Sequence, residues 1–344
     1  MIKAAVAGIA LAASCLSGAA SSEARYDILS FADLDGWERD DHAAALRVFT
    51  ETCPDMTDVD WRALCAVAQS KPGAREFFEL FFRPVLISEG RPALFTGYFE
   101  PELKGSLRPD SRFRYPIYRQ PPEAREATLW LSRREIETGE ALRDRGLEIA
   151  WVDDPVELFF LQIQGSGRIQ LRNGTTIRVG YGGSNGHDYR SIGAEMVRQG
   201  IYDIHQVSAE VIKNWVRRNP DIGSELLMHN PSYVFFRRID DLRSDRGPRG
   251  AMNRSITTGR SVAIDPKFVP LGAPVWVEKD GTDPVRRLMI AQDTGSAIKG
   301  AQRADLFMGT GDEAGRAAGQ LRDPGRMLVL LPIQRAYALA PDTL

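Results

Sequence analysis

The chain has 344 residues, 43% of them hydrophobic, so it can bury the core of one large domain or two ordinary ones. Its 44 basic and 46 acidic residues give a net charge of -2, and neither sign collects into a long block. This balance excludes the charge pattern of a protein that binds nucleic acid or an anionic membrane, and it favours a globular protein with a neutral or mixed-charge partner.

Residues 1–20 have the pattern of a secretory signal peptide. An apolar run of small residues follows Lys3 and extends to Ala20, so we predict cleavage before Ser21 and export. Cys15 lies within this run, but the residues before it fit a lipoprotein signal poorly. We expect a mature chain without lipid, and a lipid on Cys15 stays the alternative.

The segment Asp40–Phe82 has apolar residues at spacings of three and four, which predicts helices. Cys53 and Cys65 are the two cysteines that remain after cleavage, and neither has the neighbours of a zinc site. Because exported proteins meet an oxidising environment, we predict a disulfide between them. It would join helices predicted over Ala43–Cys53 and Trp61–Ala68.

After Pro84 the pattern changes to short β-type runs separated by turns. Asn173-Gly174, between two alternating apolar segments, predicts a β-hairpin. The strands predicted here are Ala93–Phe99, Phe113–Tyr118, Ile169–Leu171 and Thr175–Val179, and the helices are Arg133–Asp144, Ser191–Arg198 and Ser208–Val216.

Beyond Gly250 the chain returns to short, well-spaced strands with one helix, which favours a small β-barrel. The predicted strands are Ser261–Asp265, Pro274–Glu278, Leu288–Ala291 and Met327–Ile333, and the helix is Asp312–Leu321. No low-complexity linker separates the regions, so we expect one domain inserted in another. The polar segment Arg238–Arg254 is the candidate crossover between them.

Four clusters combine glycine with neutral polar or aromatic residues, a mixture that suits a sugar ligand. They are Thr96–Tyr98, Gln164–Gly167, Tyr181–Gly186 and Asp293–Ser296. Each could also be an ordinary tight turn, and none has the pattern of a phosphate-binding loop. No metal or cofactor motif is present, so we expect neither.

Two carboxylates in the C-terminal region are candidates for acid–base chemistry. Asp293 ends an apolar strand, and Asp305 stands among apolar residues, which raises the pKa of a carboxyl group as a general acid requires. Both could instead be a turn cap and a solvent-facing strand residue. Ser166 lacks the setting of a hydrolase nucleophile, and the histidines lack the spacing of metal ligands.

Six segments, read together and in order, resemble the membrane-bound lytic murein transglycosylase A family. The similarity runs from about Phe31 to about Pro332, and its last part looks like a small domain with three aspartates, here Asp265, Asp293 and Asp305. The six segments are Phe95–Pro101, Tyr115–Tyr118, Gln164–Gly167, Asn185–Gly193, Asn230–Phe236 and Asp293–Gly300.

The resemblance implies a mainly β fold with helices. Residues 21–103 and 246–344 would form a double-psi β-barrel, residues 104–245 an inserted β-rich domain, and a groove between the two would hold a glycan strand. It also implies a carbon–oxygen lyase that cleaves the β-1,4 bond between N-acetylmuramic acid and N-acetylglucosamine without water and leaves a 1,6-anhydro ring. No cofactor is implied.

The family pattern assigns the catalytic carboxylate to Asp305, with Asp293 in the same site. The substrate-binding residues expected from the matched segments are Thr96, Gly97, Tyr98, Gln164, Gly165, Ser166, Gly167, Asn185, Gly186, Tyr189 and Ser191. The expected partners are peptidoglycan glycan strands, with cell-wall synthesis or division complexes as further candidates.

We also expect a monomer in the periplasm, with attachment to the outer membrane left open. Two alternatives to the transglycosylase remain: a glycan hydrolase on the same barrel, and a cell-wall-binding module without catalysis.

Overall fold

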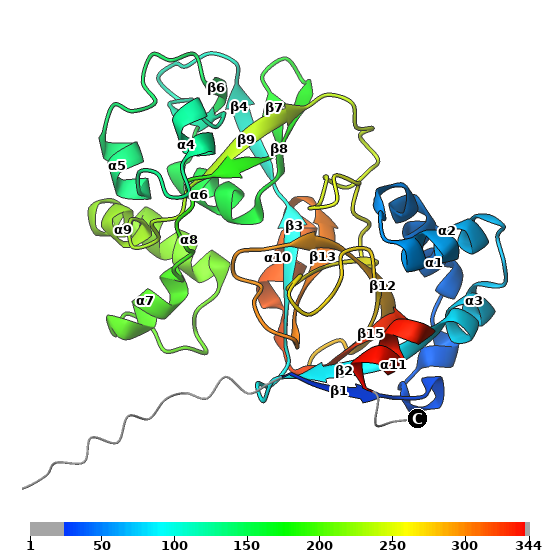
Figure 1. Ribbon diagram of the computed structural model, residues 1–344. Coiled ribbons are helices and arrows are strands. Elements are labelled where there is room, and N and C mark those ends of the chain that lie inside the picture. The colour runs from blue at the N-terminus through cyan, green and yellow to red at the C-terminus, as the bar shows by residue number, and fades with distance from the viewer. Residues whose placement is uncertain (1–23, 341–344) are drawn as a thin grey trace, which may run out of the picture.

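The computed structural model describes residues 24–340, and it contains two β-sheets with helices around each (Figure 1). The predicted signal peptide 1–20 and the lipid alternative at Cys15 lie outside the described residues. Within residues 24–340, no helix combines the length and the apolar character needed to cross a membrane.

The N-terminal region is helical, as its spacing predicts. After the short strand β1 (Arg25–Ile28) and two single turns of 3-10 helix come α1 (His42–Thr52), α2 (Val59–Gln69) and α3 (Ala74–Phe81). Asp41 and Asp58 precede α1 and α2, and each accepts a hydrogen bond from a backbone N–H of the first turn. The helices pack at one side of the first sheet, at the right of Figure 1.

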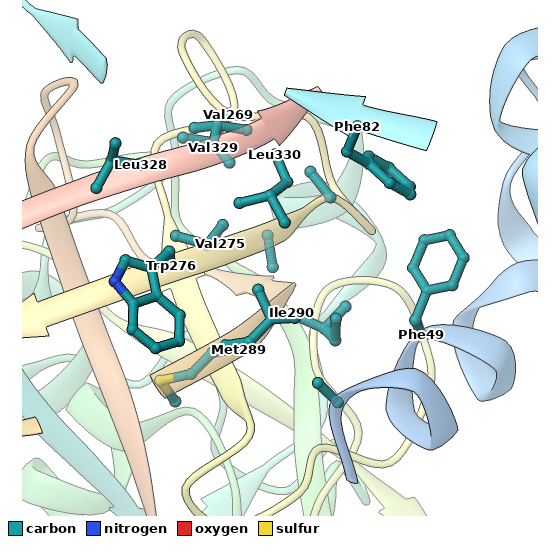
Figure 2. Close-up of a cluster of buried hydrophobic side chains, with 14 of the residues drawn as sticks. Phe49, Phe82, Val269, Val275, Trp276, Met289, Ile290, Leu328, Val329 and Leu330 are labelled. Atoms are coloured by element: carbon teal, nitrogen blue, oxygen red, sulfur yellow. The ribbon is translucent and has the colours of Figure 1, made fainter. Parts of the chain in front are cut away.

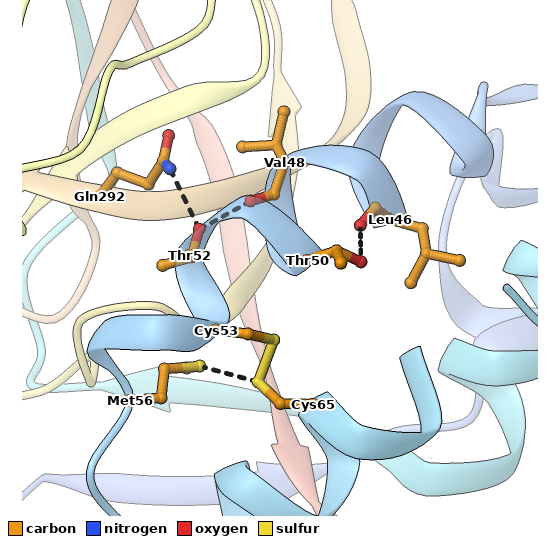
Figure 3. The surroundings of a disulfide bond; sticks show 8 residues. All are labelled: Leu46, Val48, Thr50, Thr52, Cys53, Met56, Cys65 and Gln292. Atoms are coloured by element: carbon orange, nitrogen blue, oxygen red, sulfur yellow. Dashed lines mark hydrogen bonds between the residues drawn. A yellow bond between two sulfur atoms is a disulfide. The ribbon is translucent and has the colours of Figure 1, made fainter. Parts of the chain in front are cut away.

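Cys53 and Cys65, the pair for which the sequence analysis expects a bridge, are joined by a disulfide (Figure 3). Sδ of Met56 lies 3.7 Å from Sγ of Cys65, inside the same buried cluster. Beside it, buried Gln292 of the first sheet donates to Oγ1 of Thr52 at 3.0 Å. The disulfide joins the end of α1 to α2, and the hydrogen bond holds the end of α1 on the sheet.

The first sheet has nine strands in the order β1-β2-β15-β11-β12-β10-β13-β3-β14 and curves into a nearly closed barrel (Figure 1). Most neighbours are antiparallel, but β10 runs parallel to β12, and β13 runs parallel to β3. The remaining bounds are β2 (Phe82–Ser88), β3 (Leu94–Glu100), β10 (Ser261–Ile264), β11 (Pro274–Lys279), β12 (Val285–Thr294), β13 (Arg303–Thr310), β14 (Arg322–Asp323) and β15 (Gly325–Pro332).

The barrel core is apolar and fully enclosed. Val275 and Trp276 of β11 pack with Val329 of β15, and Phe49 of α1 lies against Phe82 at the start of β2 (Figure 2). Each of these side chains is at most 1% exposed. Burial of such side chains contributes about 1.5–3 kcal/mol each, so this core supplies a rigid support for groups at its rim.

The second sheet has six strands in the order β5-β6-β4-β7-β8-β9. Its strands are β4 (Glu102–Ser106), β5 (Tyr115–Tyr118), β6 (Glu148–Val152), β7 (Gly167–Leu171), β8 (Thr176–Ser184) and β9 (Val234–Ile239). Around it lie α4 (Pro122–Glu126), α5 (Arg133–Thr138), α6 (Pro155–Gln164), α7 (Ile192–Arg198), α8 (Ala209–Arg218) and α9 (Pro220–Leu227). The predicted hairpin at Asn173-Gly174 is confirmed as the antiparallel pair β7 and β8.

The chain changes sheets at Pro101, between β3 and β4, and returns through the segment between Ile239 and Ser261. After β13 it forms α10 (Gly311–Gln320) and ends with α11 (Ile333–Leu339). The fold class, mainly β with helices in a barrel and a second β-rich part, is confirmed. Residues 104 and 245 stay our proposal for the domain boundaries.

A buried ion cluster joins the two sheets at this change. Glu100, the last residue of β3, is fully buried, and its Oε2 accepts from Arg168 of β7 at 2.9 Å and Arg178 of β8 at 3.0 Å. Thr310 of β13 donates to the same oxygen at 2.8 Å. Both arginines also donate to the carbonyl of Arg246 on the returning segment. One carboxylate thus connects three parts of the chain.

Two local predictions need correction. The helix predicted over Arg133–Asp144 ends at Thr138, because Gly139 follows in an extended conformation. The helix α6 was not predicted, because apolar residues occupy six of its ten positions and mask the helical spacing of Val156, Phe159 and Phe160. Asp154, which caps its N-terminus, and Pro155 at its first position are the signals that could have identified it.

Candidate active site

The strand order brings the two C-terminal aspartates together. β10 lies between β12 and β13, and Ala263 of β10 is in register with both Asp293 of β12 and Asp305 of β13. Residues in register on adjacent strands project to the same face of a sheet. The two carboxylates therefore flank one residue of the central strand, at one rim of the barrel.

Asp305 is half-buried and has one hydrogen-bond donor among the described residues. Oγ1 of Thr96, its register partner on β3, donates to Oδ1 at 2.5 Å. Arg303 in turn donates to Oγ1 of Thr96 at 2.8 Å. Burial raises the pKa of Asp305, while the Thr96 hydrogen bond and the charge of Arg303 act in the opposite direction.

Asp293 is held by three donors. Tyr98 of β3 donates its hydroxyl to Oδ2 at 2.9 Å, and the backbone N–H groups of Ala251 and Thr294 donate to Oδ1, each at 2.9 Å. Burial nevertheless raises the pKa of Asp293 to about 6, and the nearby charge of Asp305 adds to this increase. The pKa of Tyr98 is raised by its own burial and by Asp293, so Tyr98 is a neutral donor.

A cleft of about 780 Å³ opens over these groups and is lined from both sheets. Its barrel side includes Asp293, Asp305 and Arg303, and its other side includes the end of α6, parts of β8 and β9, and the segment that returns to the barrel. A cleft of this size, with two carboxylates of raised pKa and neutral polar groups, is suited to acid–base chemistry on an extended polar ligand.

The end of α6 is tied to the barrel strand that carries Thr96 and Tyr98. Gly165 ends α6 in the left-handed region, with φ of 76°, which glycine adopts without strain. The preceding Gln164 accepts a hydrogen bond from the backbone N–H of Phe99 through its Oε1 at 3.0 Å. The insert side of the cleft is therefore fixed against the acid-bearing side.

Comparisons with known proteins agree with this arrangement. The family model described as "MltA specific insert domain" matches residues 94–237, and the one described as "3D domain" matches residues 260–331. Membrane-bound lytic murein transglycosylase A of Vibrio cholerae is 34% identical over 72% of this chain and 69% of its own length. The chain belongs to the membrane-bound lytic murein transglycosylase A family. Its Escherichia coli K12 member is 35% identical over 69% of this chain and 65% of its own length.

Solved structures of this family share the fold. A membrane-bound lytic murein transglycosylase from Agrobacterium tumefaciens superposes with a TM-score of 0.81 at 32% identity, covering 91% of this chain and 99% of the other. The structure of E. coli MltA with bound chitohexaose superposes with a TM-score of 0.70 at 28% identity, covering 85% of this chain and 90% of that one.

Part of the residue set that the family resemblance implies lies at the cleft. Gln164, Gly165, Ser166 and Tyr189 line it. Thr96 and Tyr98 do not line it, but they hydrogen-bond the two carboxylates. Each of these six residues therefore lines the cleft or holds one of its carboxylates.

The other five residues of that set have packing or capping contacts elsewhere. Ser191 caps α7 through the N–H of Ala194, and the side chain of buried Asn185 bonds the backbone of Leu131, Pro231 and Tyr233. Three glycines allow close approach of other segments: Gly97 to Ala318 of α10, Gly167 to Leu161 and Gly186 to Thr128. None of the five lines the cleft.

Asp265, the third aspartate of the family pattern, is buried two residues beyond Ala263 and does not line the cleft. It accepts from the backbone N–H groups of Gly300 at 2.9 Å and Lys267 at 3.1 Å, so it fixes the loop between β12 and β13. Sequence reasoning missed Arg303 and Arg237, two cleft-lining arginines. Nothing in their local sequence distinguishes them from the other scattered arginines.

Proposed function

We propose that this protein is a peptidoglycan lytic transglycosylase, which cleaves the β-1,4 bond between N-acetylmuramic acid and N-acetylglucosamine and leaves a 1,6-anhydro muramic end. Family membership and the chitohexaose-bound E. coli relative support a β-1,4-linked amino-sugar ligand. The cleft, open and lined by neutral polar groups beside two acids, supports the same class of ligand.

In the first step Asp305, protonated, gives its proton to the glycosidic oxygen. The bond from that oxygen to the anomeric carbon of muramic acid breaks, and positive charge develops on the sugar ring. Burial, which raises the pKa of Asp305, favours a carboxyl that still holds a proton. When the proton has left, Thr96 and the charge of Arg303 stabilise the carboxylate.

In the second step the C6 hydroxyl of the same muramic sugar attacks the anomeric carbon. The new carbon–oxygen bond closes the 1,6-anhydro ring, and the hydroxyl proton passes to Asp305, which is thereby restored. No water enters, so a second carboxylate to activate water is not needed. An ionised Asp293, on β12 across the intervening strand β10, stabilises the positive charge of the ring.

The observation that carries this assignment is the difference in hydrogen bonding between the two acids. Asp293 accepts three hydrogen bonds, which keep it in place and favour its ionised form, whereas Asp305 accepts one. A group that must give and take a proton needs an oxygen free to meet the substrate. Asp305 meets that requirement better than Asp293.

The product mass tests the proposal. Purified protein is incubated with peptidoglycan, and the soluble fragments are weighed by mass spectrometry. A transglycosylase releases fragments that are lighter by one water than those from a hydrolase, and a binding module without catalysis releases none. Anhydro fragments are the expected result, and either of the other two outcomes contradicts the proposal.

We further propose that the protein is exported and acts on glycan strands in the periplasm as a monomer. The support is the signal-peptide pattern of residues 1–20 and the membrane-bound name of the relatives. Intact mass of the protein from its own host tests the processing: a chain beginning near Ser21 is expected, and a lipid on Cys15 would restore attachment to the outer membrane. Wall-synthesis or division complexes remain candidate partners.

A further inference from the structure

The wall of the cleft formed by the second sheet carries an arginine whose charge has no acidic partner among the described residues. Arg237, on β9, lines the cleft and is exposed. Its single hydrogen bond goes to a neutral acceptor, Oδ1 of Asn253, at 2.9 Å. A guanidinium has five N–H donors in a planar fork, so most of the donors of Arg237 remain available to a ligand.

A second arginine is held beside it. Nη1 of Arg249 donates to the same oxygen of Asn253 at 3.1 Å, so one neutral oxygen holds two guanidinium groups close together. Asp241 balances Arg249 at 2.7 Å, which leaves the pair with one unbalanced positive charge. Like charges held together disfavour each other unless an anion lies near them. An anionic group beside the pair would lower this repulsion.

The pair is built into the segment that supports the candidate acids. Asn253 has a φ of 56°, a left-handed conformation that asparagine tolerates better than most residues. In the same short turn Ala251 donates its N–H to Asp293. Arg237, Arg249 and Asn253 all line the same cleft as the two acids.

We infer that Arg237, with Arg249, forms a subsite for a carboxylate of the peptide stem of peptidoglycan. This inference rests on the proposed function. The sugars of the glycan are neutral at most positions, and the carboxylates belong to the peptides attached to the muramic sugars. A guanidinium fork beside the acids would bind such a carboxylate through two parallel hydrogen bonds and so help to place the attached muramic sugar.

The test compares three ligands bound to the full chain. In an Asp305→Asn background, which prevents turnover, dissociation constants are measured for peptide-bearing glycan strands, for strands freed of peptide, and for chitohexaose. Strands freed of peptide carry a carboxylate on the lactyl group of the sugar, and chitohexaose carries none. The comparison thus separates a peptide carboxylate from a sugar carboxylate.

The matched variants are Arg237→Gln and Arg238→Gln. Arg238 is the next residue of β9, its side chain pairs with Asp240 at 2.6 Å, and it does not line the cleft. Arg237→Gln should weaken the binding of peptide-bearing strands about tenfold, the loss of one charge-assisted interaction, and leave the other two ligands unchanged. Arg238→Gln should change none of the three.

An equal loss for all three ligands, or for none, would overturn the inference, because Arg237 would then act through the fold or not at all. A loss that is as large for the peptide-free strands would assign the carboxylate to the sugar and also overturn it. Failure of the proposed function is distinguishable: the unsubstituted protein would then bind none of the ligands or release no anhydro product.

Discussion

The two walls of the cleft hold their polar groups in different ways. On the barrel wall, Asp293 and Asp305 lie on adjacent parts of one sheet, and their hydrogen bonds come from other residues of the barrel and from its returning segment. On the insert wall, Tyr181 is 54% exposed and Arg237 has one neutral partner. The polar groups of the barrel wall are held in position before a ligand binds, whereas polar groups of the insert wall remain free to bind one.

This difference follows from the location of each wall. Side chains on central strands with a filled core behind them have few alternative positions, which suits groups that must meet a reacting bond within a fraction of an ångström. Arg237, on the edge strand β9, faces solvent and can adapt to a bulky polymer. The comparison assigns chemistry to the barrel wall and recognition to the insert wall, and four predictions test this division.

The largest effect is expected at the barrel wall, for Asp305→Asn. The amide keeps the shape of the side chain but can neither give nor accept the proton, so both steps should fail while glycan still binds. We expect a loss of at least about 10⁴-fold in the release of anhydro muropeptides. Asp221→Asn, an exposed change on α9, is the control and should keep full activity. Near-normal turnover by Asp305→Asn would contradict the mechanism.

The second prediction concerns the buried ion cluster around Glu100, which joins the two walls, and it uses the change Glu100→Gln. Among the described residues, this change leaves Arg178 without an ion-pair partner and leaves Arg168 with Glu102 alone, 3.8 Å away. Removal of one partner from a buried ion cluster costs about 3–5 kcal/mol of unfolding free energy. Denaturant unfolding measures the loss. Glu102→Gln, on the exposed side of the same connection, should cost less than about 1 kcal/mol. Equal losses would mean that Glu100 does not act as the joint.

Much of the fold could be predicted from the sequence because its signals are local. Asn173-Gly174 between alternating residues indicates a hairpin wherever it occurs, and Ser191 and Ser208 mark the starts of α7 and α8. The helix α6 was not predicted because apolar residues on most of its surface remove the amphipathic pattern, so that only the capping signal at Asp154 remains. Sequence patterns report a helix best when one of its faces is exposed.

Like the fold, the candidate site has residues that could be predicted from the sequence and residues that could not. Asp293 and Asp305 stand out in sequence by their motif and apolar neighbours, although their roles stay predictions. The link from Arg237 to Asn253 joins a strand of one sheet to a turn that leads into the other. No local pattern carries such a contact, because it depends on how the two sheets meet. The acids could be nominated from sequence, and the arginine pair could not.

The third prediction concerns the loss of folding stability that comes from burying the ionised carboxylate of Asp293 in the barrel. Its pKa of about 6 in the folded protein exceeds the value of 3.8 for a free side chain, so burial disfavours the ionised form. Unfolding then becomes easier as pH rises from about 4 to about 6, and the penalty stays constant above that. Asp293→Asn removes the charge, so it should stabilise the protein by at most about 3 kcal/mol above about pH 6 and by nothing near pH 4.

Thermal unfolding of both proteins at about pH 4 and about pH 7.5 measures this difference, and activity should fall in the more stable variant. A gain of equal size at both pH values would come from something other than the charge. A loss of stability at the higher pH would mean that the three hydrogen bonds of Asp293 outweigh its burial.

The smallest effect is expected for Tyr98→Phe. This change tests how the barrel wall controls the pKa of Asp293. The Tyr98 hydroxyl stabilises the ionised form of Asp293 and so lowers the pKa of that carboxyl. Without the hydroxyl the pKa of Asp293 should rise above about 6, and activity that needs an ionised Asp293 should appear only at a higher pH. Because a hydrogen bond to a charged group contributes about 1.5–3 kcal/mol, the acid limb of the rate profile should move up by about one to two pH units. Tyr181→Phe removes the same hydroxyl from the insert wall, where it has no hydrogen bond to Asp293, and should leave that limb in place. If the limb does not move in Tyr98→Phe, the protonation of Asp293 does not control the rate. Asp305 would then act without the help of an ionised Asp293.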